Sequence, residues 1–129
     1  MRVPFIIAVP NGKGQHTSRL VEDLDLYATL AELCDLPKPK DIEGRSLEPL
    51  LKNPNAKWDY PAYSMTAYRN SLGRSVRMGR WHYVEWDEGK SGTILTDLEN
   101  DPKELKNLAQ DPKYAKTVED MRKLLKQMP

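Results

Sequence analysis

Four short segments between Pro61 and Thr96 have the composition and spacing of β-strands: residues 61–68, 75–78, 81–86 and 93–96. They favour the aromatic and β-branched residues that suit a pleated surface, and only short turns separate them. The turns fall at Asn70 to Gly73 and at residues 87–90. Strands joined by such short turns pair antiparallel, because a parallel pair needs a long crossover. The sequence therefore predicts a four-stranded antiparallel sheet.

An amphipathic helix is predicted after this sheet. It starts at Asp111-Pro112, since proline is favoured in the first turn of a helix. Its apolar face carries Val118, Met121, Leu124 and Leu125, and its lysines stay in solvent. The predicted fold class is therefore α+β: a small four-stranded antiparallel sheet with a C-terminal helix packed on it.

The segment before Lys38 has a different character. Phe5–Val9 is a continuous apolar run between two prolines, which predicts a strand covered on both faces, as in a parallel sheet. From Leu20 to Cys34 apolar residues recur at helical spacing, with Asp23 or Asp25 as the N-cap. We expect this helical stripe to be a packing face. A lone buried-type strand followed by a helix indicates the remnant of a larger α/β domain.

The charge balance excludes several function classes. Lys and Arg total 20 against 19 Asp and Glu, so the net charge of +1 predicts no general affinity for nucleic acid or an anionic membrane. Cys34 is the only cysteine, so no intramolecular disulfide can form. The apolar run at the N-terminus is too short for a signal peptide, and no stretch approaches the roughly 20 apolar residues of a membrane helix.

Four stretches, in order along nearly the whole chain, are similar to motifs of one family. Val3–Ile7 resembles its Arg-Val-Pro-Leu-Ile strand, and Asp23–Leu30 its Val-Asp-Leu-Tyr-Pro-Thr-Leu helix start, with alanine where proline is usual. Gly44–Leu51 resembles Gly-x-Ser-Leu-x-Pro-Leu-Leu. Leu95–Ala109 resembles the ending Leu-Tyr-Asp-Leu, Asp-Pro-x-Glu, Asn-Leu-Ala, with Thr96 in place of tyrosine. On these motifs the chain resembles the C-terminal region of a sulfatase, near the iduronate-2-sulfatase branch.

This resemblance implies an architecture. Sulfatases resemble alkaline phosphatases, with a large mixed sheet between helices, followed by a smaller subdomain of four antiparallel strands and a helix. Residues 1–57 would then be the remnant of the end of the catalytic domain, comprising strand, helix and linker. Residues 58–129 would be the C-terminal subdomain, in agreement with the periodicity above.

The resemblance also implies which chemistry this chain lacks. Sulfatases hydrolyse sulfate esters with a formylglycine made in a Cys/Ser-x-Pro/Ala-x-Arg motif, beside a cation, usually calcium, that Asp and Asn oxygens hold. Cys34 is followed by Asp35-Leu36-Pro37-Lys38, so the proline falls one place late and lysine replaces arginine. We expect Cys34 to be a buried core residue. We therefore predict no catalytic residue, no metal ligand and no cofactor in this chain, and calcium and formylglycine only in a full-length sulfatase.

Arginines flank the second and third predicted strands. Arginine's planar fork suits bidentate contact with sulfate or carboxylate. Strand alternation places Arg77 on the other face of the sheet from Val76 and Met78, and His82 on the other face from Trp81 and Tyr83. In the enzymes that this chain resembles, the C-terminal subdomain borders the active-site cleft. Arg74, Arg77 and His82 are therefore the candidate substrate-binding residues, for a sulfated sugar. The alternative is that these arginines lie on a solvated sheet face.

Two functional interpretations remain open at this point. The first is a C-terminal sulfatase region, not catalytic alone, whose partner is the missing N-terminal domain; a full-length member is expected in the periplasm or outside the cell. The second is a small independent α+β module for protein contact or weak binding of sulfated polysaccharide. A fragment should expose the Phe5–Val9 strand edge and the Leu20–Cys34 stripe, which invite self-association.

Overall fold

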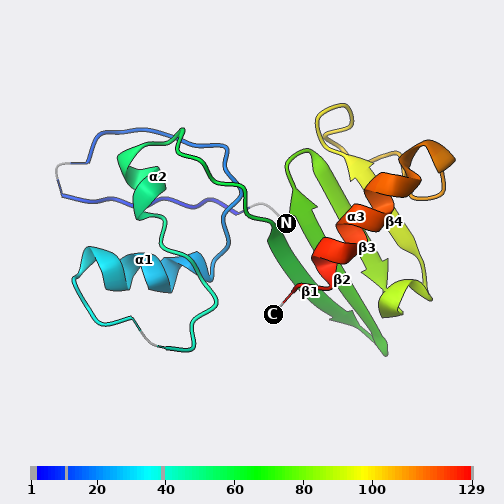
Figure 1. The fold of residues 1–129 in the computed structure, drawn as a ribbon, viewed down its shortest axis with the longest axis horizontal. Helices are drawn as coiled ribbons and strands as arrows, with labels where there is room; N and C mark the ends of the chain where they lie inside the picture. Colours follow the sequence, from blue (N-terminus) through cyan, green and yellow to red (C-terminus); the bar gives the residue numbers. More distant parts are fainter. Residues whose placement is uncertain (1–2, 11, 39, 129) are drawn as a thin grey trace.

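The computed structural model describes residues 3–10, 12–38 and 40–128. The element order is α1 (Asp25–Leu33), α2 (Glu48–Lys52), β1 (Ala62–Tyr68), β2 (Ser71–Met78), β3 (Trp81–Trp86), η1 (Asp87–Gly89), β4 (Thr93–Asp97), η2 (Pro112–Tyr114) and α3 (Ala115–Leu125). The two short helices α1 and α2 lie to one side of the sheet, and α3 crosses one of its faces (Figure 1). The predicted α+β class is confirmed.

The sheet has the predicted antiparallel order, β1-β2-β3-β4. Its second strand is longer than the pattern indicated, because the first turn needs only Arg69 and Asn70, with Arg69 in the left-handed region at φ 54°. Gly73, expected in that turn, lies inside β2 opposite Trp86. A Cβ there would stand 3.0 Å from the indole ring, so a glycine lets the ring lie flat on the strand.

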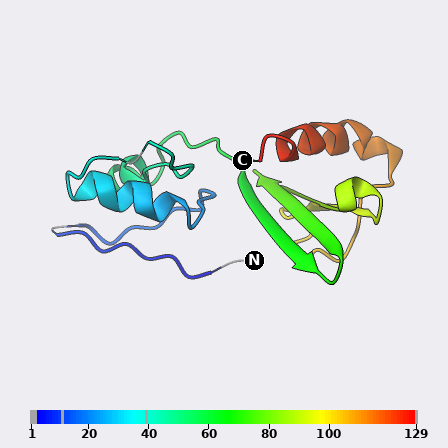
Figure 2. The same ribbon diagram turned by 90° about the horizontal axis from the view of Figure 1, so that it is seen from below.

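The main core lies between the sheet and α3 (Figure 2). Val76, Tyr83 and Leu95 come from three adjacent strands, and each is completely buried. Met121 and Leu125 of α3 cover them. The strand residues point to one face of the sheet, and the helix residues lie on one face of α3. The two sets therefore meet in a single layer. The predicted covering helix is confirmed.

The two edges of the sheet differ. At β4, Asn107 Oδ1 accepts a hydrogen bond from Leu95 N at 3.1 Å, and Leu108 N donates to Leu95 O at 2.8 Å. At β1, Glu22 Oε1 accepts from Tyr63 N at 2.7 Å, while Met65 beyond it is 62% exposed. The β4 edge is thus covered by the chain itself, and the outer half of β1 is open to solvent.

The Phe5–Val9 segment is not a strand, which corrects the sequence prediction. It is extended, with no strand of the described chain paired to it. Phe5 and Ile7 pack against the small cluster of Leu47, Leu50 and Trp58, whereas Ile6 is 90% exposed. Because Phe5 and Ile7 are packed while Ile6 between them is not, the apolar run is covered on one side only.

Helix α1 is shorter than the stripe of residues 20–34, and its N-terminus differs from the prediction. Its N-cap is Leu24, without a side-chain cap. Asp25 is only 2% exposed; its carboxylate accepts hydrogen bonds from Glu22 N at 2.9 Å and Arg45 N at 2.8 Å. The carboxylate therefore joins the loop before α1 to the loop before α2.

The buried face of α1 consists of small residues, Ala28, Thr29 and Ala31. Thr29 Oγ1 accepts a hydrogen bond from Leu47 N at 2.9 Å. Beside it Gly44 lies directly against the backbone of α1, where a Cβ would come within 1.9 Å of Leu24 O. This close approach explains why a glycine opens the Gly44–Leu51 motif.

The leucine stripe of α1, predicted to be a packing face, is exposed in this chain. Leu24, Tyr27, Leu30 and Leu33 are between 39% and 58% exposed. Cys34, which we expected in the core, is also exposed and lies directly after the helix. Both differences have one cause: α1 packs through its small residues against the Gly44–Leu51 segment, so its large side chains point the other way.

Candidate functional site

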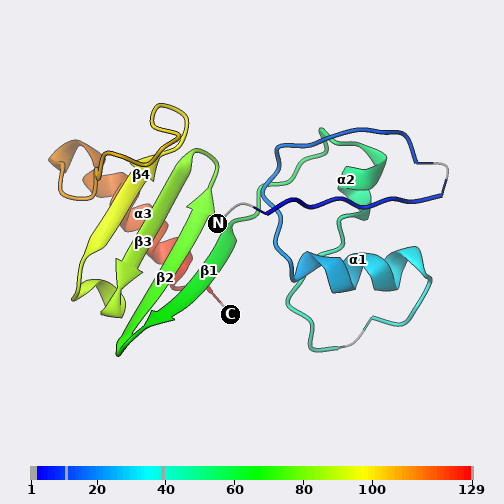
Figure 3. The same cartoon turned by 180° about the vertical axis from the view of Figure 1, so that it is seen from behind.

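Figure 3 shows the face of the sheet that α3 does not cover. Strand alternation places two of the three predicted site residues, Arg77 and His82, on this face, because their neighbours Val76 and Tyr83 point into the core under α3. Arg77 of β2 is directly opposite His82 of β3, and His82 is directly opposite Thr96 of β4. Directly opposite residues of an antiparallel pair point to the same face and lie within reach of each other. Arg77, His82 and Thr96 therefore form a polar row across three strands.

Glu104 completes this polar row from outside the sheet. Its Oε2 lies 2.6 Å from His82 Nδ1, and it accepts a hydrogen bond from Thr96 Oγ1 at 3.0 Å. Burial would raise the pKa of Glu104, but the hydrogen bonds from His82 and Thr96, with the nearby charge of Arg77, hold this pKa below its usual value. An ionised Glu104 orients the imidazole through Nδ1, so Nε2 is the ring nitrogen that a ligand would meet.

Arg74, the third predicted site residue, lies on the opposite face. It pairs with Glu85 of β3, and its Nη2 donates to Glu85 Oε1 at 2.9 Å. Glu85 is 3% exposed and is also approached by Arg122 of α3 at 3.6 Å and by the Tyr83 hydroxyl at 3.4 Å. Burial is the main cause that raises the pKa of Tyr83, which therefore stays protonated at neutral pH and donates to the carboxylate. Arg74 thus belongs to an ion-pair network around the buried Glu85, in which the side chains of Arg74 and Arg122 are 28% and 44% exposed.

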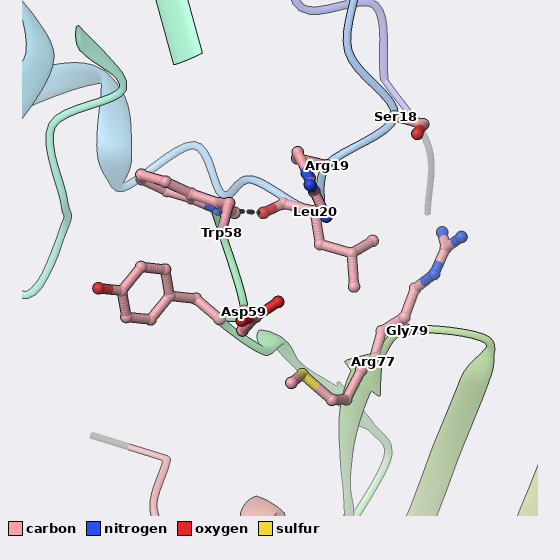
Figure 4. Close-up of a pocket in the computed structure, with 9 residues that line it drawn as sticks. Ser18, Arg19, Leu20, Trp58, Asp59, Arg77 and Gly79 are labelled. Carbon is pink, nitrogen blue, oxygen red and sulfur yellow. Dashed lines mark hydrogen bonds between the residues drawn. The ribbon is translucent and has the colours of Figure 1, made fainter. Parts of the chain in front are cut away.

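A hollow of about 290 Å³ adjoins Arg77 at the end of β2. One wall comes from the loop of Ser18, Arg19 and Leu20, and another from Trp58 to Tyr60 at the entry to the sheet. Figure 4 shows the Arg77 side chain extending from β2 toward the Ser18 loop. The hollow therefore lies where the part of the chain before residue 61 meets the sheet.

The described residues do not fit a formylglycine and calcium centre. Within residues 3–10, 12–38 and 40–128 no three His, Cys, Asp or Glu side chains are grouped so that they could hold a metal ion. Cys34 is exposed and lies beyond the last turn of α1, and the arginine of the formylglycine motif is replaced by Lys38. The described side chains therefore do not provide the converging oxygen ligands that a calcium ion needs.

An α+β unit of this topology, with the motifs from Gly44 to Ala109 on it, is the C-terminal region of a sulfatase. The chain belongs to the family of N-sulphoglucosamine sulphohydrolase C-terminal domains, whose model matches residues 1–129. The predicted resemblance to the sulfatases is thereby confirmed.

Three relatives are especially informative. A Delta 4,5-hexuronate-2-O-sulfatase of Bacteroides thetaiotaomicron is 39% identical over 95% of this chain and 27% of its own length. Arylsulfatase K of Xenopus laevis is 34% identical over 83% of this chain and 22% of its own length. The solved structure of BT1596, a 2-O GAG sulfatase, superposes with a TM-score of 0.70 at 37% identity, covering 80% of this chain and 23% of that one. The chain therefore spans about a quarter of the length of these relatives.

Proposed function

We propose that this chain is the C-terminal part of a hydrolase that removes sulfate from a uronic-acid sugar, with Arg77 and His82 contacting the substrate. The 39% identity to a hexuronate-2-O-sulfatase, extending over 95% of the chain, carries the proposal. The polar row supports it, because a guanidinium beside an oriented imidazole is suited to a sulfate or carboxylate. Arg74 is left out of the proposed site because its partner is the buried Glu85.

The catalytic step belongs, in this proposal, to a region outside residues 1–129. That region supplies the formylglycine and the calcium ion, and the present chain supplies substrate contacts. Residues 1–57 are then the end of the catalytic domain and residues 58–129 a subdomain with its own core between the sheet and α3. None of the helices in the described ranges combines the length and apolarity needed to cross a bilayer. We propose a periplasmic or extracellular location, as for sulfatases in general.

The stripe of α1 is the surface proposed to meet the catalytic region. Leu24, Tyr27, Leu30 and Leu33 recur at every third residue from the N-cap through α1, and all four are exposed. Monomeric soluble proteins rarely expose so many large apolar side chains close together. Relatives about four times as long contain the additional chain that would cover it. The independent-module interpretation leaves this stripe without a partner.

A chimera tests the proposed function. This chain replaces the matching 27% of the Bacteroides thetaiotaomicron relative, and hydrolysis of an unsaturated 2-O-sulfated uronate disaccharide is followed. We expect turnover, and we expect Arg77→Gln to lower kcat/KM about tenfold, the cost of one charge-assisted contact. Arg69→Gln, at the tip of the first hairpin, is the matched control and should leave kcat/KM unchanged. A folded, calcium-loaded chimera without turnover would contradict the proposal.

The exposed stripe leads to a prediction for the chain alone. We expect self-association at tens of micromolar, because association buries the leucines. Leu30→Lys should give a monomer in sedimentation velocity, whereas Leu105→Lys, at an 82% exposed site outside the stripe, should not. Ile6→Lys tests the edge of the extended Phe5–Val9 segment in the same way. A monomeric wild-type chain would favour the independent-module interpretation instead.

A further inference from the structure

The carboxylate of Glu104 determines which nitrogen of the His82 ring carries a proton. Glu104 Oε2 lies 2.6 Å from His82 Nδ1. Burial opposes ionisation, but the hydrogen bonds from His82 and Thr96 keep the pKa of Glu104 below its usual value, so the carboxylate is ionised at neutral pH. An ionised carboxylate can only accept hydrogen bonds, so the hydrogen of this contact belongs to Nδ1. In a neutral imidazole Nε2 then has a lone pair and no hydrogen, which makes it a hydrogen-bond acceptor.

The Nε2 atom of His82 is open to a ligand. Among the residues that the structure describes, none forms a hydrogen bond with Nε2, nor is Nε2 one of the buried side-chain atoms without a partner. The His82 side chain is 23% exposed. A ring nitrogen that is neither bonded nor buried faces solvent, so a ligand reaches it without any rearrangement of the sheet.

Glu104 is held in place by the loop that follows β4. Its backbone N donates to Asp101 O at 3.0 Å, and its φ of 55° lies in the left-handed region, which costs free energy in a residue other than glycine. Thr96, which is 1% exposed, donates from Oγ1 to the same Oε2 atom at 3.0 Å. Further along the loop, Leu108 N donates to Leu95 O at 2.8 Å and ties the loop to β4. The carboxylate is therefore positioned before any ligand binds, which lowers the entropy lost on binding.

We propose that Glu104 is a positioning residue that makes His82 accept a hydrogen bond from a hydroxyl group of the substrate sugar. The inference rests on the proposed function and deepens it, because it divides the sugar between two cross-strand neighbours. Arg77 contacts the anionic group, and His82 Nε2 contacts a hydroxyl of the same ring. An unsaturated 2-O-sulfated uronate keeps one free ring hydroxyl, on carbon 3. Glu104 thereby selects a sugar in which this hydroxyl is unmodified.

Nitrogen-15 NMR of the imidazole in the full 129-residue chain tests the role of Glu104. The chain has two histidines, so His16→Gln leaves the His82 ring as the single signal. At about pH 8, where an ordinary histidine is neutral, we expect a proton on Nδ1 and none on Nε2. Glu104→Gln, whose amide can either accept or donate, should move a large share of the proton to Nε2.

The matched control for the tautomer is Glu88→Gln. Glu88 is an exposed glutamate in η1 that also has a left-handed backbone, with φ 60°. This variant makes the same chemical change away from the polar row and should leave the His82 signals unchanged. A wild-type ring protonated on Nε2, or on both nitrogens, overturns the inference, as does an unchanged tautomer in Glu104→Gln.

The chimera described above tests the hydroxyl contact. Kinetic constants are compared for the unsaturated 2-O-sulfated disaccharide and its analogue without the hydroxyl on carbon 3. We expect kcat/KM to be about tenfold lower for the analogue, the value of one hydrogen bond. Glu104→Gln should reduce this ratio to about threefold, because part of the His82 rings then carry hydrogen on Nε2. The loss should fall mainly in KM, since the contact is present in the bound substrate as well as in the transition state.

The outcomes separate the inference from the proposed function. Turnover with equal kcat/KM for both disaccharides rejects the inference alone, and so does a ratio that Glu104→Gln leaves at its wild-type value. A folded chimera without turnover rejects the proposed function and with it the hydroxyl contact. In that case the NMR result still decides whether Glu104 sets the tautomer of His82.

Discussion

Gly44→Ala is expected to lower the free energy of unfolding by about 3 kcal/mol or more, because the new Cβ meets backbone that cannot move aside. The Cβ would stand 1.9 Å from Leu24 O and 2.5 Å from the carbonyl carbon of the same residue. Relief requires α1 to separate from the Gly44–Leu51 segment, which breaks the hydrogen bond between Asp25 and Arg45 N. Urea unfolding measures the loss, and hydrogen exchange of the α1 amides shows where it occurs.

Gly14→Ala is the matched control for this variant. An added Cβ at Gly14 meets nothing within 4 Å, so the same chemical change should alter the free energy of unfolding by less than about 0.5 kcal/mol. Equal stability of the two variants would contradict the close contact between Gly44 and α1. The Gly44–Leu51 motif would then need another explanation than packing.

Glu85→Ala is expected to cost about 2 kcal/mol of folding free energy, since it removes the buried member of a partly exposed ion-pair network and leaves the donors around it unpaired. Glu85 is 3% exposed, and Arg74, Arg122 and the Tyr83 hydroxyl all point at its carboxylate. The substitution leaves the completely buried Tyr83 without its acceptor and Arg74 without its counter-charge. Urea unfolding gives the free energy, and near-ultraviolet circular dichroism reports the packing of α3 on the sheet.

Glu119→Ala provides the comparison on α3 itself. Glu119 pairs with Lys123 at 2.7 Å, but both side chains are more than 60% exposed. Exposed pairs of this spacing contribute only about 0.3–0.5 kcal/mol, so the variant should unfold almost like the wild type. If Glu85→Ala were as mild as Glu119→Ala, the network under α3 would not be an anchor of the fold.

The sheet and α3 could be predicted because the residue pattern that identifies each element also decides which of its side chains are buried. Val76, Tyr83 and Leu95 alternate with polar neighbours, and the same alternation decides which side chains enter the core. The first turn is shorter than predicted, because Gly73 belongs to β2. A glycine beside a strand pattern can indicate either a turn or close contact with an aromatic ring, and the sequence does not distinguish the two. The strand boundaries therefore depended on Trp86, which lies far from Gly73 in sequence.

The region before the sheet was predicted less well, because its apolar residues have few partners within this chain. A continuous run such as Phe5–Val9 indicates burial on two sides, yet Ile6 is 90% exposed. Likewise the leucines of α1 have helical spacing, but the helix buries Ala28, Thr29 and Ala31 instead. Periodicity identifies a face, while the partner of that face depends on the rest of the fold.

The structure brings together two of the three residues predicted for the candidate site, Arg77 and His82. Positions 74 and 77 differ by an odd number, so strand alternation alone separates Arg74 from Arg77, and proximity in sequence was the wrong criterion. Glu104, which orients His82, was present in the Asp-Pro-x-Glu motif, but nothing in the sequence connects that motif to β3. Arg19 gave no sequence signal, because it reaches the hollow only through the folding of its loop.

The two edges of the sheet differ in whether a further strand can be added to them. Asn107 and Leu108 occupy the outer backbone groups of β4 and thereby prevent a further strand from adding there. At β1 the backbone beyond Tyr63 remains able to pair. Any lengthening of the sheet by another chain, in a natural assembly or in an aggregate, must therefore begin at β1, and a lysine or proline introduced there would terminate it.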